Sequence, residues 1–89
     1  MSCSVATTST APLVAEADKM YALAMKEYRL GFPGQPNADR HMKKAWDMFK
    51  KAQAKYESAY KIEPSSAIED KIALCQREIY SCQKQFKMK

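Results

Sequence analysis

Three cysteines and one histidine are the residues of this chain that could support nucleophilic or metal chemistry. Cys75 and Cys82 are seven residues apart, which on one helix separates them by about 10 Å along its axis. The Cα atoms of a disulfide rarely lie more than about 7 Å apart, so these two cannot pair within a helix. A zinc site needs more ligands at suitable spacing, and the chain has no Cys-x-x-Cys pair. We therefore expect small buried thiols, with no metal and no cofactor.

No arrangement of a nucleophile with an oriented base is recognisable in the sequence. The single histidine, His41, is far in sequence from Cys75 and Cys82. The two glycines are not followed by the Lys-Ser/Thr of a phosphate-binding loop. Glu69 and Asp70 fall in the expected first turn of a helix, where acidic side chains complement the helix dipole. The sequence therefore predicts no enzymatic activity and no catalytic residues.

The composition is that of one small domain. The chain has 89 residues, of which 46% are hydrophobic and 28% charged, and its net charge is +5. No apolar run approaches the roughly 20 residues needed to span a bilayer. Residues 1–10 lack the basic start and the apolar stretch of a secretory signal. Together with the odd number of cysteines, these features lead us to expect a cytoplasmic protein.

Two clusters of helix-breaking residues separate three segments of helical periodicity. The first cluster, residues 31–37, holds both glycines and two of the four prolines. The second is at Pro64, because proline disfavours helical geometry at the residue before it. Ser66 and Glu69 then have the spacing of a capping box. We predict helices over residues 12–30, 38–62 and 66–87, preceded by a disordered segment at 1–11.

Each segment gathers apolar residues on one face. In the second, Ala45, Ala52 and Ala59 recur every seven residues between large aromatic side chains. In the third, apolar residues are spaced by alternating fours and threes, which is a near-heptad seam. That seam consists of Ile68, Ile72, Cys75, Ile79, Cys82 and Phe86. We predict the all-α class and an antiparallel three-helix bundle of spectrin-like architecture, whose close helix packing is related to that of a tetratricopeptide hairpin.

The three segments resemble the MIT (microtubule-interacting and trafficking) domain family over about residues 13–86. The second segment carries the family's alternation of alanine and aromatic residues and ends on a Lys-apolar-Glu sequence, and the third carries the family's apolar and lysine spacing. In the second segment these residues are Ala45, Trp46, Phe49, Ala52, Tyr56, Ala59, Tyr60, Lys61, Ile62 and Glu63. In the other two they are Ala17, Met20, Tyr21, Ala24, Ile68, Lys71, Ile72, Cys75, Ile79 and Cys82.

The sequence also departs from the MIT pattern. The connection at residues 31–37 is longer than the family's usual tight turn. Gln76 and Tyr80 stand where the family often has leucine and an acidic residue, and Glu78 replaces a common arginine. The first two segments also resemble the first helices of the soluble NSF attachment proteins. The short third segment after the Pro-Ser-Ser turn favours the MIT family.

The resemblance implies binding rather than catalysis. MIT domains take short segments from the tails of ESCRT-III subunits into grooves between helices, in membrane trafficking and remodelling. A three-helix bundle has a groove on each side of its third helix, one against the first helix and one against the second. We predict that one flank of the third helix lines a peptide-binding groove, through Ala73, Gln76, Tyr80 and Gln83. We expect a monomer that is recruited to endosomal membranes or microtubules.

Charge leaves a second function open. Residues 40–62 carry seven basic and two acidic residues, and a helical wheel places the basic ones opposite the aromatic face. The predicted basic face consists of Lys43, Lys44, Lys50, Lys51 and Lys55. It would attract acidic tubulin tails or acidic membranes, as in the N-terminal module of a microtubule-severing or trafficking ATPase. We expect no nucleic acid as partner, because no exposed aromatic residues are interleaved. A purely structural bundle that dimerises through the third helix also stays open.

Overall fold

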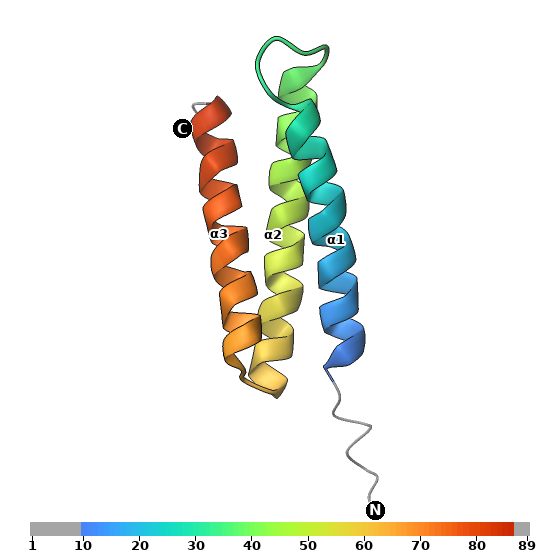
Figure 1. Cartoon of the computed structure of the whole chain (residues 1–89), viewed down its shortest axis with the longest axis vertical. Helices are drawn as coiled ribbons and strands as arrows, with labels where there is room; N and C mark the ends of the chain where they lie inside the picture. Colours follow the sequence, from blue (N-terminus) through green and yellow to red (C-terminus); the bar gives the residue numbers. More distant parts are fainter. Residues whose placement is uncertain (1–9, 87–89) are drawn as a thin grey trace, which may run out of the picture.

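The computed structural model describes residues 10–86, which form three helices. These are α1 (Ala11–Leu30), α2 (Ala38–Ile62) and α3 (Ser66–Phe86). Figure 1 shows them side by side and antiparallel, with α2 in the middle. The predicted three-helix bundle of the all-α class is confirmed. Helix α1 begins one residue earlier than predicted, whereas the expected disorder of residues 1–9 and the expected helical end at residue 87 lie outside the described residues.

Helix α2 is the centre of the bundle. Both α1 and α3 pack along it, while α1 and α3 make few direct contacts with each other. Ala45, Ala52 and Ala59 are fully buried, as their seven-residue spacing predicts. Two core clusters follow one another along the bundle. One contains Ala17, Ala52, Tyr56, Ala59, Ile68 and Cys75, and the other contains Ala24, Met42, Ala45, Phe49 and Cys82.

The two glycines of the α1–α2 connection serve different purposes. Gly31 is buried against α2, where an added Cβ would lie 2.8 Å from the backbone nitrogen of Met42. Gly34 has open space around it but a φ of +95°, which L side chains rarely adopt. Asn37, directly before α2, also has a positive φ, of 57°. The connection therefore needs glycine once for close approach and once for backbone conformation.

Helix α3 has a side-chain cap one residue earlier than predicted. The backbone N–H of Ile68 donates a hydrogen bond to Ser65 Oγ at 3.1 Å, and the N–H of Glu69 donates to the Ser65 carbonyl at 3.0 Å. Ser65 directly follows Pro64 in non-helical backbone, so it occupies the N-cap position. The capping box predicted for Ser66 and Glu69 was therefore wrong, because Glu69 is the fourth helical residue rather than the third.

This cap can be tested with two neighbouring serines. We expect Ser65→Ala to lower the free energy of unfolding by about 1 kcal/mol, because the N–H of Ile68 loses its partner. Ser66→Ala should leave stability nearly unchanged or raise it slightly, since alanine is the better helix former at an exposed position. Urea denaturation followed by circular dichroism measures both. Equal losses for the two variants would contradict the assignment.

Candidate functional site

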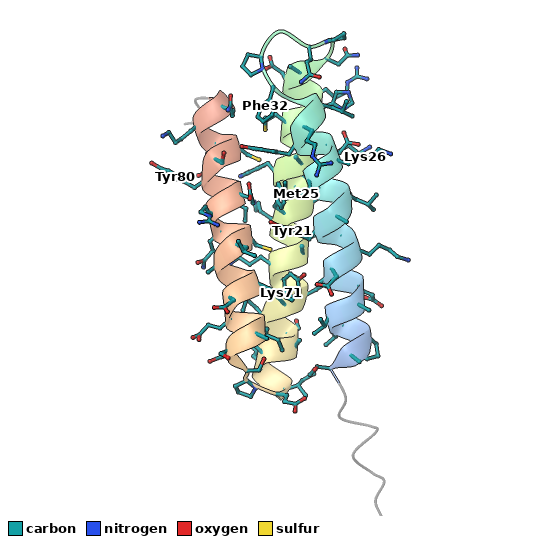
Figure 2. All side chains as sticks on the ribbon, viewed as in Figure 1. Tyr21, Met25, Lys26, Phe32, Lys71 and Tyr80 are labelled. Atoms are coloured by element: carbon teal, nitrogen blue, oxygen red, sulfur yellow. The ribbon has the colours of Figure 1, made fainter. Side chains whose placement is uncertain are left out.

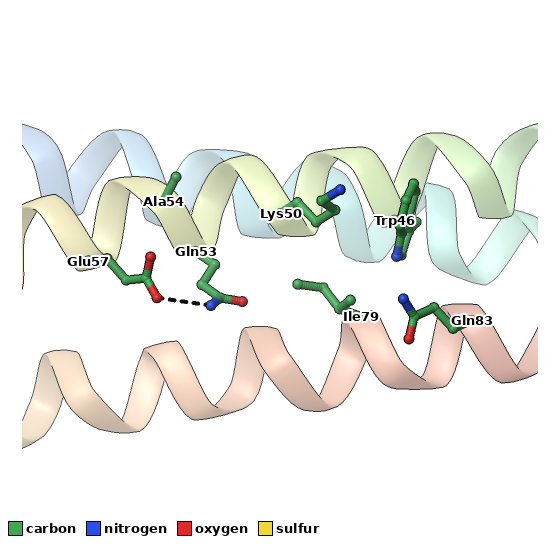
Figure 3. Close-up of a pocket in the computed structure, with 7 residues that line it drawn as sticks. All are labelled: Trp46, Lys50, Gln53, Ala54, Glu57, Ile79 and Gln83. Carbon is green, nitrogen blue, oxygen red and sulfur yellow. Dashed lines mark hydrogen bonds between the residues drawn. The ribbon is translucent and has the colours of Figure 1, made fainter. Parts of the chain in front are cut away.

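A groove lies between α2 and α3 and forms a hollow of about 270 Å³. Figure 3 shows its lining. Helix α2 contributes Trp46, Lys50, Gln53, Ala54 and Glu57, and α3 contributes Ile79 and Gln83. The groove has an apolar strip made by Trp46, Ala54 and Ile79, with polar side chains around it. On the α2 side of the groove, two of these polar side chains contact each other: Gln53 Nε2 donates a hydrogen bond to Glu57 Oε2 at 3.0 Å.

Helical geometry explains why these residues share one flank of α2. Each residue turns the helix by 100°, so Trp46 is displaced by that angle from the buried Ala45. Lys50 follows Trp46 by four residues, or about one helical turn. Gln53 and Glu57 follow these two by seven residues each, or about two turns, so all four side chains point to the same side. The central alanine stripe packs in the core, and the residues one position later face α3 and the solvent beside it.

Trp46 is the most unusual residue of the groove. Its indole Nε1 is buried and has no hydrogen-bond partner among the described residues. Lys50 Nζ lies 4.1 Å from the centre of the Trp46 ring, and Lys43 Nζ lies 5.6 Å from it, so both make cation–π contacts. In Figure 3 the ring nitrogen points toward α3 and Gln83. An unpaired buried donor costs about 1–3 kcal/mol, which an acceptor oxygen from Gln83 or from a groove occupant would recover.

The four residues predicted on α3 do not share one groove. Gln83 lines the groove beside α2. Ala73 lines a shallow hollow formed by α3 alone, together with Asp70 and neighbouring side chains. Tyr80 is 62% exposed and points away from α2 in Figure 2. Gln76 is exposed and does not line the hollow beside α2.

The four predicted residues are separated because the buried seam of α3 faces α2. Cys75 and Cys82 are fully buried and face α2. Tyr80 is five residues from Cys75, which turns it by about 140° to the outer side of the helix. The sequence pattern also missed the α2 wall of the groove, because Trp46 was assigned to the core. The one signal in the sequence was the 100° rotation of Trp46 from Ala45 around the helix, which places Trp46 at the edge of the buried face of α2.

The predicted basic face is divided between two sides of α2. Lys50 and Lys43 lie beside the Trp46 ring, on the α3 side. Lys44 Nζ lies 3.9 Å from a carboxylate oxygen of Glu27, and Lys55 Nζ lies 3.0 Å from one of Glu16, so these two turn toward α1. Lys51 is exposed. No single surface of α2 therefore presents all five lysines together.

The two cysteines within the described residues, Cys75 and Cys82, are placed where they cannot react readily. Burial, together with the charge of Glu78, raises the pKa of Cys75 to about 11 and that of Cys82 to about 12. Both thiols are therefore protonated at neutral pH, and the thiolate is the nucleophilic form. His41 Nδ1 instead lies 2.7 Å from Glu27 Oε1, between α2 and α1. Within residues 10–86, no three His, Cys, Asp or Glu side chains gather as metal ligands would.

Comparisons with protein-family models, curated proteins and solved structures found no match to this chain. The resemblance to MIT domains therefore depends on the alanine and aromatic pattern of α2 and on the apolar seam of α3.

Proposed function

We propose that this protein is a non-catalytic interaction module of MIT type, which binds a short segment of a partner protein in the groove between α2 and α3. The observation that carries the proposal is Trp46, a half-buried aromatic ring at the groove whose indole N–H has no partner within the described structure. The ring offers apolar contact area, and the buried N–H lacks an acceptor, which an occupant would supply once the Gln83 side chain moves aside. This combination is typical of interface anchors.

The dimensions of the groove favour a peptide over a small molecule. Its hollow of about 270 Å³ is smaller than most ligand pockets and is open along its length. From Trp46 to Glu57 the α2 wall extends about 16 Å, or about three helical turns. A partner helix of that length would place apolar side chains at i, i+3 or i+4, and i+7 on the strip formed by Trp46, Ala54 and Ile79. Its polar residues would meet the rim.

The partner class comes from the family resemblance. MIT domains take tail segments of ESCRT-III subunits, so we propose an ESCRT-III-like tail peptide as the occupant, in membrane trafficking or remodelling. Lys50 and the Trp46 N–H both favour an acceptor oxygen near that end of the groove, whereas Glu57 favours a basic or N–H group at the other end. The occupant is therefore expected to bind in one direction only.

An arginine at either of two exposed alanines tests the position of the site. We expect Ala54→Arg to weaken peptide binding about tenfold or more, because the new side chain fills the groove between helices. Ala73→Arg adds the same side chain to the outer surface of α3 and should change affinity by less than about twofold. Both positions are exposed and arginine is a good helix former, so the bundle should stay folded. The single tryptophan reports binding directly through its fluorescence.

Peak shifts in isotope-labelled protein locate the bound peptide independently of fluorescence. Shifts that cluster on residues 46–57 and 79–83 support the groove. If Ala73→Arg abolishes binding while Ala54→Arg does not, the peptide sits on the outer flank that includes Tyr80 instead. If no ESCRT-III-like tail peptide shifts any peak at millimolar concentration, the proposed function is wrong.

A further inference from the structure

The surface that α1 and α2 form on their shared flank combines exposed apolar side chains with many cations. Leu23 and Leu30 are seven residues apart on α1 and are 46% and 39% exposed, beside the half-buried Met20. Six basic residues surround them. They are Lys19 and Lys26 of α1, and Arg40, Lys44, Lys51 and Lys55 of α2. We call these apolar and basic residues the α1–α2 face.

Contacts between the two helices show that several of these residues share one side. The ion pairs Lys55–Glu16 and Lys44–Glu27 both cross from α2 to α1 there. A hollow of about 250 Å³ at the same place is lined by Glu16, Lys19, Met20, Leu23 and Lys55. Lys51 is four residues before Lys55 and seven after Lys44, so it points to the same flank of α2. By the same spacing, Arg40 precedes Lys44 by one turn.

The positive charge of this face is only partly compensated. Glu16 and Glu27 are each paired with a lysine, and Glu27 also contacts His41. A third acidic residue, Asp47, lies one helical turn before Lys51 and pairs with Lys43 at 4.0 Å. No carboxylate within residues 10–86 lies at ion-pair distance from Lys19, Lys26, Arg40 or Lys51. Four unpaired cations therefore surround a shallow apolar strip, on a chain whose total net charge is +5.

We infer that the α1–α2 face binds the surface of an anionic lipid bilayer. The cations between Arg40 and Lys55 extend over about 22 Å of α2, and more lie on α1. A planar anionic surface contacts all of them at once, whereas an acidic peptide lying in one groove reaches only a few. Each cation close to such a membrane strengthens binding about fivefold. The lysine stems and the two leucines lie among the headgroups, with the ammonium groups at the phosphates.

The proposed contact is with the membrane surface, and no helix within residues 10–86 is long and apolar enough to span a bilayer. It also leaves the α2–α3 groove open, since that groove is on the other flank of α2. The inference goes beyond the proposed function and does not depend on it. A bilayer and a partner segment would occupy opposite sides of the same central helix.

Cosedimentation with phosphatidylcholine vesicles, with and without phosphatidylserine, tests the inference. The intact chain should pellet with the anionic vesicles only, and less so when salt is raised to about 0.15 M. We expect Lys19→Glu with Lys51→Glu to reduce the partition coefficient by about tenfold or more. The matched control is Lys61→Glu with Lys84→Glu, which makes the same charge change off the face and should reduce it far less. Circular dichroism verifies that both double variants are folded.

A second pair of variants tests the apolar contribution. Leu23→Ser should weaken partitioning severalfold, while Tyr80→Ser, at an exposed position on the outer side of α3, should leave it unchanged. Three results would overturn the inference. They are equal losses for both lysine pairs, equal binding to vesicles without phosphatidylserine, and binding of a glutamate-rich peptide with no binding to vesicles. The last result would make the face a protein interface.

Discussion

Replacing Phe49 by alanine is expected to unfold the bundle. Phe49 is fully buried on α2, and the rings of Tyr21 and Tyr28 from α1 meet it edge-on at centroid distances of 5.4 and 6.2 Å. Truncating a buried phenylalanine costs about 3–5 kcal/mol, through lost burial and the cavity left behind. A single core of this size supplies only about 3–5 kcal/mol in total. The free energy of unfolding should therefore fall to near zero, so the variant should lose about half or more of its helical signal at room temperature.

Circular dichroism during thermal unfolding measures this effect. Two control variants separate lost volume from other consequences of the change. Phe49→Leu keeps most of the volume and should cost less than about 1.5 kcal/mol, so that this variant stays folded. Phe32→Ala removes a ring that is 40% exposed and contacts Tyr28 edge-on, and it should cost much less than Phe49→Ala. An unfolding midpoint for Phe49→Ala equal to that of the wild type would mean that this cluster is not the centre of the core.

The elements of the fold could be predicted because their signals are local. The prolines and glycines of residues 31–37 and Pro64 interrupt the helical pattern, and the predicted helix boundaries differ from the observed ones by at most one residue within the described range. The seven-residue spacing of Ala45, Ala52 and Ala59 identified the buried side of α2 for the same reason. The cap was misplaced because Ser65 and Ser66 are adjacent, and only the backbone geometry after Pro64 decides between them.

The candidate site could be predicted only in part, because a groove is defined by two helices. The apolar seam of α3 shows which side is buried, but not which flank will lie beside α2. Gln83 was therefore placed at the groove, while Tyr80, on the same predicted flank, points away from α2. The predicted basic face is split between two sides of α2 for the same reason, since the neighbouring helices decide where each lysine points. Lys55 pairs with Glu16, which is 39 residues away in sequence, and no local pattern contains that contact.

A cluster of three polar side chains joins all three helices, and its loss should have the second largest effect. The Tyr56 hydroxyl of α2 donates a hydrogen bond to Asp18 Oδ1 of α1, and Lys71 Nζ of α3 donates to the same oxygen at 3.1 Å. Figure 2 labels Lys71 on α3. Because α1 and α3 otherwise make few direct contacts, this cluster and the 2.5 Å hydrogen bond between Tyr28 and Ser81 hold the two outer helices in register.

We expect Tyr56→Phe to lower the free energy of unfolding by about 1.5–2 kcal/mol. A hydrogen bond to a charged group contributes about 1.5–3 kcal/mol, and the low end applies because the Asp18 side chain is 47% exposed. Tyr60→Phe is the matched control, since it removes a hydroxyl from a half-buried tyrosine one helical turn further along α2. It should cost much less. Urea denaturation at neutral pH compares the two variants with the wild type.

The pH dependence of stability separates this hydrogen bond from packing. Burial alone would raise the pKa of Asp18, but the hydrogen bonds from Tyr56 and Lys71 and the charge of Lys71 together bring it below its ordinary value of 3.8. A carboxyl whose pKa is lowered by folding stabilises the folded state above its unfolded pKa, and this contribution is lost as pH falls through the folded-state pKa. Wild-type stability should therefore decline as pH falls below about 4.

In Tyr56→Phe the Asp18 pKa should move back toward its ordinary value, because one of the groups that lower it is gone. The part of the acid-dependent loss that belongs to Asp18 should therefore shrink in this variant, while Tyr60→Phe keeps the wild-type slope of unfolding free energy against pH. Asp18→Asn removes the titrating group and should flatten the same part of the curve. Adding Tyr56→Phe to Asp18→Asn should then cost less than it does alone, because the hydroxyl no longer meets a charged acceptor. Parallel pH profiles for Tyr56→Phe and the wild type would show that the tyrosine acts through packing only.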